Sequence, residues 1–187
     1  MNRIEELAKR FGNHVSAPWQ KNLAGEQKTL MVIYPKEDER RLRVLLGLFE
    51  EKSKSAGHPW QEFDCTRLFA EWMSSQEYRE SYFEEPDSLS LALKSAFRPY
   101  VVQRIRASLQ SQSADENTVI ALTGLGSLFG FVHISEVLRE VSGCIRGRLA
   151  VFFPGDYENH SYRFLDARDG WNYMAIPITT TSGMFDI

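Results

Sequence analysis

Short apolar runs alternate with amphipathic stretches along the chain, and this alternation limits the possible folds more than any other feature. Three runs are rich in β-branched and aromatic residues and have the length of buried strands, 29–34, 118–123 and 148–153, and a further strand is predicted over 60–65. Between them, apolar residues recur at three- and four-residue spacing, as on one face of a helix, at 3–11, 42–49, 68–73, 89–109 and 134–145. Strands that alternate with helices predict right-handed crossovers and a mainly parallel sheet.

The predicted fold is therefore an α/β three-layer sandwich with about five strands, Rossmann-like or P-loop-like but without a Walker A motif. Proline residues predict several boundaries within it. The Arg98-Pro99 step predicts a kink in a long helix over 87–111 or a break into two helices, and Pro154 is expected to end the fourth strand. A last strand candidate covers 171–178, and Pro177 places it at an edge of the sheet.

The chain has the size and charge of a single acidic domain, 1–187, with a net charge of -3 and a pI of about 5.9. This charge disfavours nucleic acid as the main partner. No apolar run approaches the length of a membrane span, and residues 1–12 lack the apolar core of a signal peptide, so a cytoplasmic protein is expected. Cys65 and Cys144 fit a reducing compartment and are interpreted as small buried side chains.

A glycine-rich loop follows the third predicted strand, where a parallel sheet binds its ligands. Gly124, Gly126, Ser127 and Gly130 are the candidate phosphate-loop residues, because glycines after a strand let backbone N–H groups approach a phosphate. The spacing departs from the dinucleotide motif, and the lysine of a Walker A loop is missing. A tight structural turn or a partner-binding loop is the favoured alternative.

The sequence predicts no catalytic residue, no cofactor and no metal site. Ser127 lacks the flanking glycines of a nucleophile elbow. The four histidines are scattered without metal-ligand spacing. Asp156 and Glu158 could offer oxygen ligands to a metal, but a surface turn is the favoured interpretation.

Aromatic and arginine side chains in loops and charged stretches are the candidates for binding a protein partner, because these residue types are enriched in interface cores. The candidates are Phe129, Phe131, Tyr78, Tyr82 and Arg168. For Tyr78 and Tyr82 the alternative is ordinary packing of a half-buried helix. Arg168 belongs to a run of mixed charge, 166–170, which could equally be solvated surface.

Six sequence blocks follow one another along nearly the whole chain: YPKEDERR at 34–41, FAEWM at 69–73, YRESYF at 78–83, GSLFGF at 126–131, IRGRLAVFFPG at 145–155 and YRFLDARDGWNY at 162–173. In this order they resemble the BrxB family of BREX (bacteriophage exclusion) phage-defence systems. The resemblance implies a role in restricting phage beside a DNA methyltransferase, an AAA+ ATPase and the phosphatase-like protein PglZ. It also implies an accessory subunit without assigned enzymatic activity, and it supplies no catalytic residues.

Two functions follow as hypotheses. The first is a non-enzymatic adaptor that binds other BREX components, with a PglZ-like protein as the first partner. The second is a nucleotide- or phosphate-sensing regulatory subunit that uses the loop 124–130. Weak contact with DNA through arginines is the least favoured, and the sequence leaves the oligomeric state open, including a homo-oligomer. The arginines concerned are Arg98, Arg104, Arg106, Arg146 and Arg148.

Overall fold

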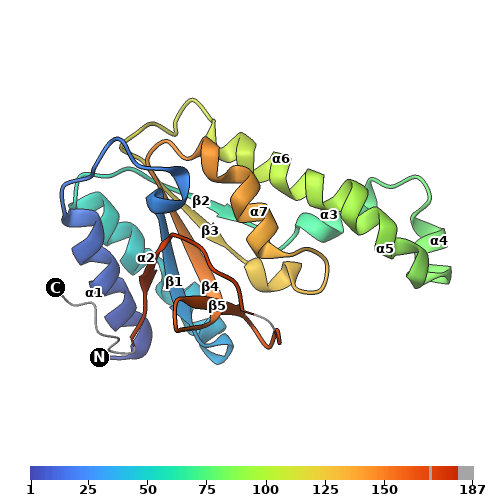
Figure 1. The fold of residues 1–187 in the computed structure, drawn as a ribbon, viewed down its shortest axis with the longest axis horizontal. Coiled ribbons are helices and arrows are strands. Elements are labelled where there is room, and N and C mark those ends of the chain that lie inside the picture. Colours follow the sequence, from blue (N-terminus) through green and yellow to red (C-terminus); the bar gives the residue numbers. More distant parts are fainter. Residues whose placement is uncertain (169, 181–187) are drawn as a thin grey trace.

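A six-stranded sheet forms the centre of the protein in a computed structural model that describes residues 1–168 and 170–180. The strand order is β2-β3-β4-β1-β6, with all neighbours parallel, and β5 pairs antiparallel with β4 outside this path (Figure 1). The predicted domain 1–187 also includes 169 and 181–187, which lie outside the described residues. The strands are β1 (Thr29–Tyr34), β2 (Trp60–Asp64), β3 (Val119–Thr123), β4 (Arg148–Glu158), β5 (Ser161–Phe164) and β6 (Ile176–Ile178).

Helices cover both faces of the sheet, which confirms the predicted three-layer α/β sandwich. On one face, α1 (Arg3–Ser16) and α2 (Glu39–Ser55) pack against alternate strand residues such as Val32. On the other face, α6 (Arg98–Leu109) and α7 (Ile134–Val141) pack against the intervening strand residues, such as Ile33. Because successive strand side chains point to opposite faces, a strand buried on both sides is apolar throughout, as β1 and β3 are.

The first helix is longer than its apolar stripe predicted. Asn2 and Glu5 form a reciprocal capping box at its start, and this satisfies backbone N–H groups that lack helical partners. The helix continues past the predicted end at residue 11 to Ser16, because Val15 lies on the same buried face. Short 3-10 turns lie between the main elements: η1 (Gly25–Lys28), η2 (Lys36–Asp38), η5 (Leu125–Leu128) and η6 (Ser142–Cys144).

The prediction that Pro154 ends the fourth strand is wrong, because β4 leaves the parallel sheet there and continues as one arm of a hairpin with β5. Gly155 lies so close to β5 that a Cβ atom would come 2.0 Å from the carbonyl oxygen of Arg163. Asn159 and His160 make the two-residue turn with φ angles of 50° and 61°, the left-handed backbone that suits tight hairpins. The strand β6 lies at one edge of the sheet, next to β1, as Pro177 predicted.

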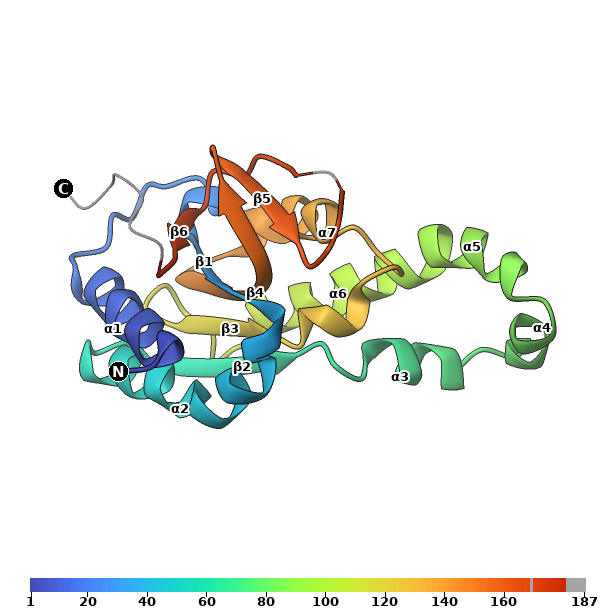
Figure 2. The ribbon, with the colours of Figure 1, turned by 90° about the horizontal axis from the view of Figure 1, so that it is seen from below.

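The segment between β2 and α6 forms a helical arm, which Figures 1 and 2 both show projecting beyond the sheet. It comprises α3 (Leu68–Ser74), α4 (Arg79–Glu84), the 3-10 turn η3 (Pro86–Ser88), α5 (Leu89–Ala92) and the π-helical turn η4 (Leu93–Phe97). The predicted helix over 87–111 is thus divided, and the irregular turn precedes Pro99. The Arg98 N–H donates to the Leu93 carbonyl, five residues back, because Pro99 has no N–H with which to continue the regular ladder.

Two parts of this arm are distinguished below. The tip is residues 77–91, which contain α4 and all of α5 but its last residue, at the far end of the projection (Figure 2). The base is the aromatic cluster where the arm meets the body of the protein: Phe69, Trp72, Phe97, Tyr100 and Phe131.

Candidate functional site

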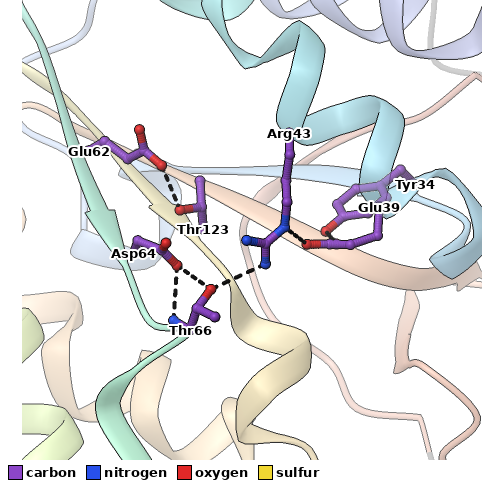
Figure 3. A network of polar contacts seen from close by, with 7 residues as sticks. All are labelled: Tyr34, Glu39, Arg43, Glu62, Asp64, Thr66 and Thr123. Atoms are coloured by element: carbon purple, nitrogen blue, oxygen red, sulfur yellow. Dashed lines mark hydrogen bonds and ion pairs between the residues drawn. The ribbon is translucent and has the colours of Figure 1, made fainter. Parts of the chain in front are cut away.

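Polar side chains gather at the carboxyl edge of the sheet, where β1, β2 and β3 end (Figure 3). Several of them line a cavity of about 220 Å³ between α2 and the ends of β2 and β3: Glu39, Arg43, Glu62, Asp64 and Thr123. On the α2 side, the Tyr34 hydroxyl donates a hydrogen bond to Glu39, and Arg43 donates to the same carboxylate over 2.8 Å. Arg43 also donates to the Thr66 hydroxyl at 3.2 Å, which ties α2 to the segment after β2.

The β2 side of this network is acidic. Asp64 accepts hydrogen bonds from both the backbone N–H and the hydroxyl of Thr66, and Glu62 accepts one from the Thr123 hydroxyl at 2.9 Å. With Glu39, three carboxylates and one guanidinium, that of Arg43, thus line the cavity. Such a surface disfavours a phosphate group, because like charges repel in a partly enclosed site.

Tyr34 and Cys65, near this edge, are held in their neutral forms. Burial, and then the bond to Glu39, raises the pKa of Tyr34, so its phenol stays neutral and acts as a donor. Burial also raises the pKa of Cys65, which follows β2 directly. A buried thiol with a raised pKa is a poor nucleophile. Within residues 1–168 and 170–180, no group of three or more histidine, cysteine or acidic side chains is arranged to hold a metal ion.

The glycine loop packs against this network. Gly124 has a φ of +71°, and a Cβ atom there would lie 2.3 Å from the Asp64 carboxylate. The N–H of Ser127 donates to the Gly124 carbonyl and that of Phe129 to the Gly126 carbonyl, both at 3.2 Å. Those N–H groups therefore already have acceptors within the loop. Phosphate binding by Gly124, Gly126, Ser127 and Gly130 stays a prediction from sequence.

A second, larger hollow of about 430 Å³ lies between the β4–β5 hairpin and the end of α7. Two of its polar side chains donate to backbone carbonyls: Arg139 to Asn172 at 3.4 Å, and the Tyr173 hydroxyl to Leu138 at 3.3 Å. Burial raises the pKa of Tyr173 to about 12, which keeps this phenol neutral. These contacts connect the segment after the hairpin to α7.

Four of the five arginines considered for DNA contact are engaged within the protein. Arg98 pairs with Glu136 at 2.6 Å, and Arg104 pairs with Glu71 at 3.0 Å. Arg106 donates to the Glu140 carbonyl at 3.0 Å, and Arg148 is buried. Ion pairing of Arg98 and Arg104 and burial of Arg148 therefore disfavour a basic face for phosphates.

The structure separates the two phenylalanines of the glycine loop. Phe129 is 44% exposed, and its ring contacts that of Phe164 at the edge of the core, with ring centroids 5.7 Å apart. Phe131 is half-buried and stacks on Phe69 at 4.0 Å. Arg168 is exposed in the segment after β5. Phe129 and Arg168 are thus accessible, while Phe131 belongs to the base of the arm.

The two tyrosines of the arm also differ in exposure. Tyr78 is 70% exposed at the tip, whereas Tyr82 is half-buried and packs on the larger core cluster. Sequence reasoning missed two more exposed apolar residues of the tip, Phe83 at 65% and Leu91 at 73%. Leu91 could have been found, because it falls between Leu89 and the next member of the buried stripe.

The fold and these surfaces define a three-layer α/β protein with a projecting helical arm. At the carboxyl ends of its parallel strands it has a network of polar side chains that hydrogen-bond to one another. Residues 61–178 match the family model described as BREX protein BrxB. This match covers more than half of the chain and includes the whole arm, so the chain belongs to the BrxB family and is a component of a BREX phage-defence system. The resemblance seen in the sequence is thereby confirmed.

Searches of curated proteins and of solved structures found no match. Within the described ranges, no helix has the length and apolar character needed to cross a lipid bilayer.

Proposed function

We propose that this protein is a non-catalytic adaptor subunit of its BREX system, which binds other BREX proteins and a PglZ-like protein first among them. The observation that carries the proposal is the exposure of Tyr78, Phe83 and Leu91 on a part of the molecule that projects from its body. Large apolar side chains exposed together on a projection are typical of a protein-binding surface.

The chemistry of the sheet edge supports a binding role over catalysis. Its carboxylates, hydroxyls and arginine bond to one another, and its buried thiol is held in the protonated form. A nucleophile requires an adjacent base, and a phosphate requires a surplus of positive charge. The described residues lining this cavity include neither a histidine nor a lysine.

The test is co-purification from cells that express the whole neighbouring operon, with a tag on this chain and mass spectrometry of the eluate. Stoichiometric recovery of the PglZ-like protein is the expected result for the wild-type chain. The double variant Tyr78→Ala/Phe83→Ala is expected to recover little or none of the PglZ-like protein. Val44→Ala is the matched control, because Val44 is an exposed apolar residue on α2, at 82% exposure, outside the arm.

A wild-type chain that recovers no other BREX protein would refute the adaptor role. Phe129 and Arg168 form a second candidate contact surface, to be tested with Phe129→Asp and Arg168→Ala in the same assay. Phe131→Asp is unsuitable for this purpose, because placing a charge against Phe69 would damage the core.

A further inference from the structure

We propose that the tip binds an apolar groove on another protein whose rim carries lysine and arginine side chains. This inference rests on the proposed adaptor function and adds to it the chemistry of the partner. It follows from three properties of the tip: its charge, the absence of ion pairs for most of its carboxylates, and its exposed apolar side chains.

The negative charge of this protein is concentrated at the tip. Residues 77–91 contain five carboxylates and one arginine, a net charge of -4, while the whole chain has a net charge of -3. The rest of the chain therefore has a net charge of +1. A short segment with more negative charge than the entire protein attracts basic surfaces over a distance of about one Debye length.

The tip carboxylates differ in their surroundings from Glu71, the other acid of the arm, which pairs with Arg104. Glu77, Glu84, Glu85 and Asp87 are all exposed, and none of them makes an ion pair with another residue of the described part of the chain. The fifth, Glu80, has only a long contact with Arg79 at 3.5 Å. Their charge is therefore available to cations outside the protein.

Apolar side chains are interspersed with these carboxylates. Tyr78, Phe83 and Leu91 expose 70%, 65% and 73% of their surface. Burial in a groove would remove this apolar surface from water, while charges at its rim fix orientation and speed association. The combination is that of an interface with an apolar centre and a charged border.

The same charge argues against other occupants. Nucleic acid and anionic lipid both present negative charge to the tip, and they would be repelled. Two tips of this chain in symmetric contact would bring two charges of -4 together. A different protein with a basic rim is the occupant that satisfies both the apolar and the charged residues.

The test measures binding of the full-length chain to the purified PglZ-like protein and, separately, to each other protein of the operon. In one variant, Glu77, Glu84 and Glu85 are changed to Gln and Asp87 to Asn. The control removes the same charge from exposed carboxylates outside the arm, by changing Glu37, Glu51, Glu116 and Glu158 to Gln. Thermal unfolding of both variants checks that the fold is kept.

The tip variant is expected to associate about 10-fold or more slowly than the control at low salt, and to lose most of the salt dependence of the wild-type chain. Phe83→Ala is expected to weaken binding about 30-fold, the size of a hot-spot residue. A carbodiimide, which joins carboxylates to amines in contact, is expected to cross-link the tip to lysines of the partner.

The outcomes separate the two proposals. No binding by the wild-type chain to any operon protein would overturn the adaptor function and this inference with it. Normal binding and normal salt dependence in the tip variant would overturn this inference alone. Cross-links from the tip to a second copy of this chain, or to no protein at all, would also overturn it.

Discussion

Aromatic side chains at the base and at the tip of the arm, and the acids near them, lie in opposite surroundings. At the base, Phe97 is fully buried and contacts the rings of Phe69 and Trp72 at 5.3 and 5.1 Å. At the tip, Phe83 is 65% exposed. The acids differ likewise, since Glu71 pairs with Arg104 near the base while most tip carboxylates have no ion pair among the described residues.

This difference shows that residue type alone does not decide whether an aromatic or an acid stabilises the fold. A buried ring contributes to folding stability through the apolar surface that it removes from water. An exposed ring contributes that energy only when a partner covers it. The base is therefore expected to hold the arm in place, and the tip is expected to make contacts with other proteins.

The largest effect is expected for Phe97→Ala. Because its ring is fully buried among Phe69, Trp72 and Phe131, its removal should lower the free energy of unfolding by about 3–5 kcal/mol. Phe83→Ala, the matched change at the tip, should stay within about 0.5 kcal/mol of the wild type. Urea unfolding followed by circular dichroism measures both. Equal losses for the two variants would abolish the distinction between base and tip.

An intermediate effect on the free energy of unfolding is expected within the glycine loop. There, two phenylalanines only two residues apart compare a half-buried position with an exposed one. Phe131→Ala should cost about 1–3 kcal/mol of unfolding free energy, because its ring stacks on Phe69 at 4.0 Å. Phe129→Ala should cost less, since nearly half of its surface is already in water. The same urea titration ranks them, and the reverse order would mean that Phe131 does not belong to the base.

The smallest effect on the free energy of unfolding is expected for substitutions of the acidic residues of the arm. Glu71→Gln removes the negative charge that pairs with Arg104, whose pKa is raised first of all by its hydrogen bond to Glu71. Both side chains are about two-fifths exposed, so the loss should stay below about 1 kcal/mol and shrink at high salt.

Glu84→Gln is the control for this pair, and it should not lower stability at either salt concentration. Chemical denaturation at low and high salt makes the measurement. A salt-sensitive loss of stability in Glu84→Gln would reveal an ion pair at the tip and weaken the case for an external basic partner.

Much of the fold could be predicted from local patterns, because they act over a few residues. The apolar run of β1 and the stripe of α2 each correspond to one element of the structure. The hairpin formed by β4 and β5 was missed, because Pro154 and Gly155 commonly end a strand. The antiparallel partner that keeps Gly155 extended comes from a later segment, and its pairing with Gly155 is not visible in the local pattern.

The candidate surfaces were predicted in part. Aromatic composition pointed to Tyr78 and Phe129, which are exposed, and equally to Tyr82 and Phe131, which pack inward. A single sequence gives no direction for such side chains in short helices and loops.

The sequence by itself determined the α/β class, the alternation of strands and helices, the acidity of residues 77–91 and the family. All four depend on residue types and spacing along the chain. The tertiary structure alone decided the strand order, the enclosure of Gly124 by Asp64, and which aromatics of the arm are buried. These features depend on contacts between segments far apart in the chain, and packing settles them by burying the most apolar surface that chain connectivity allows.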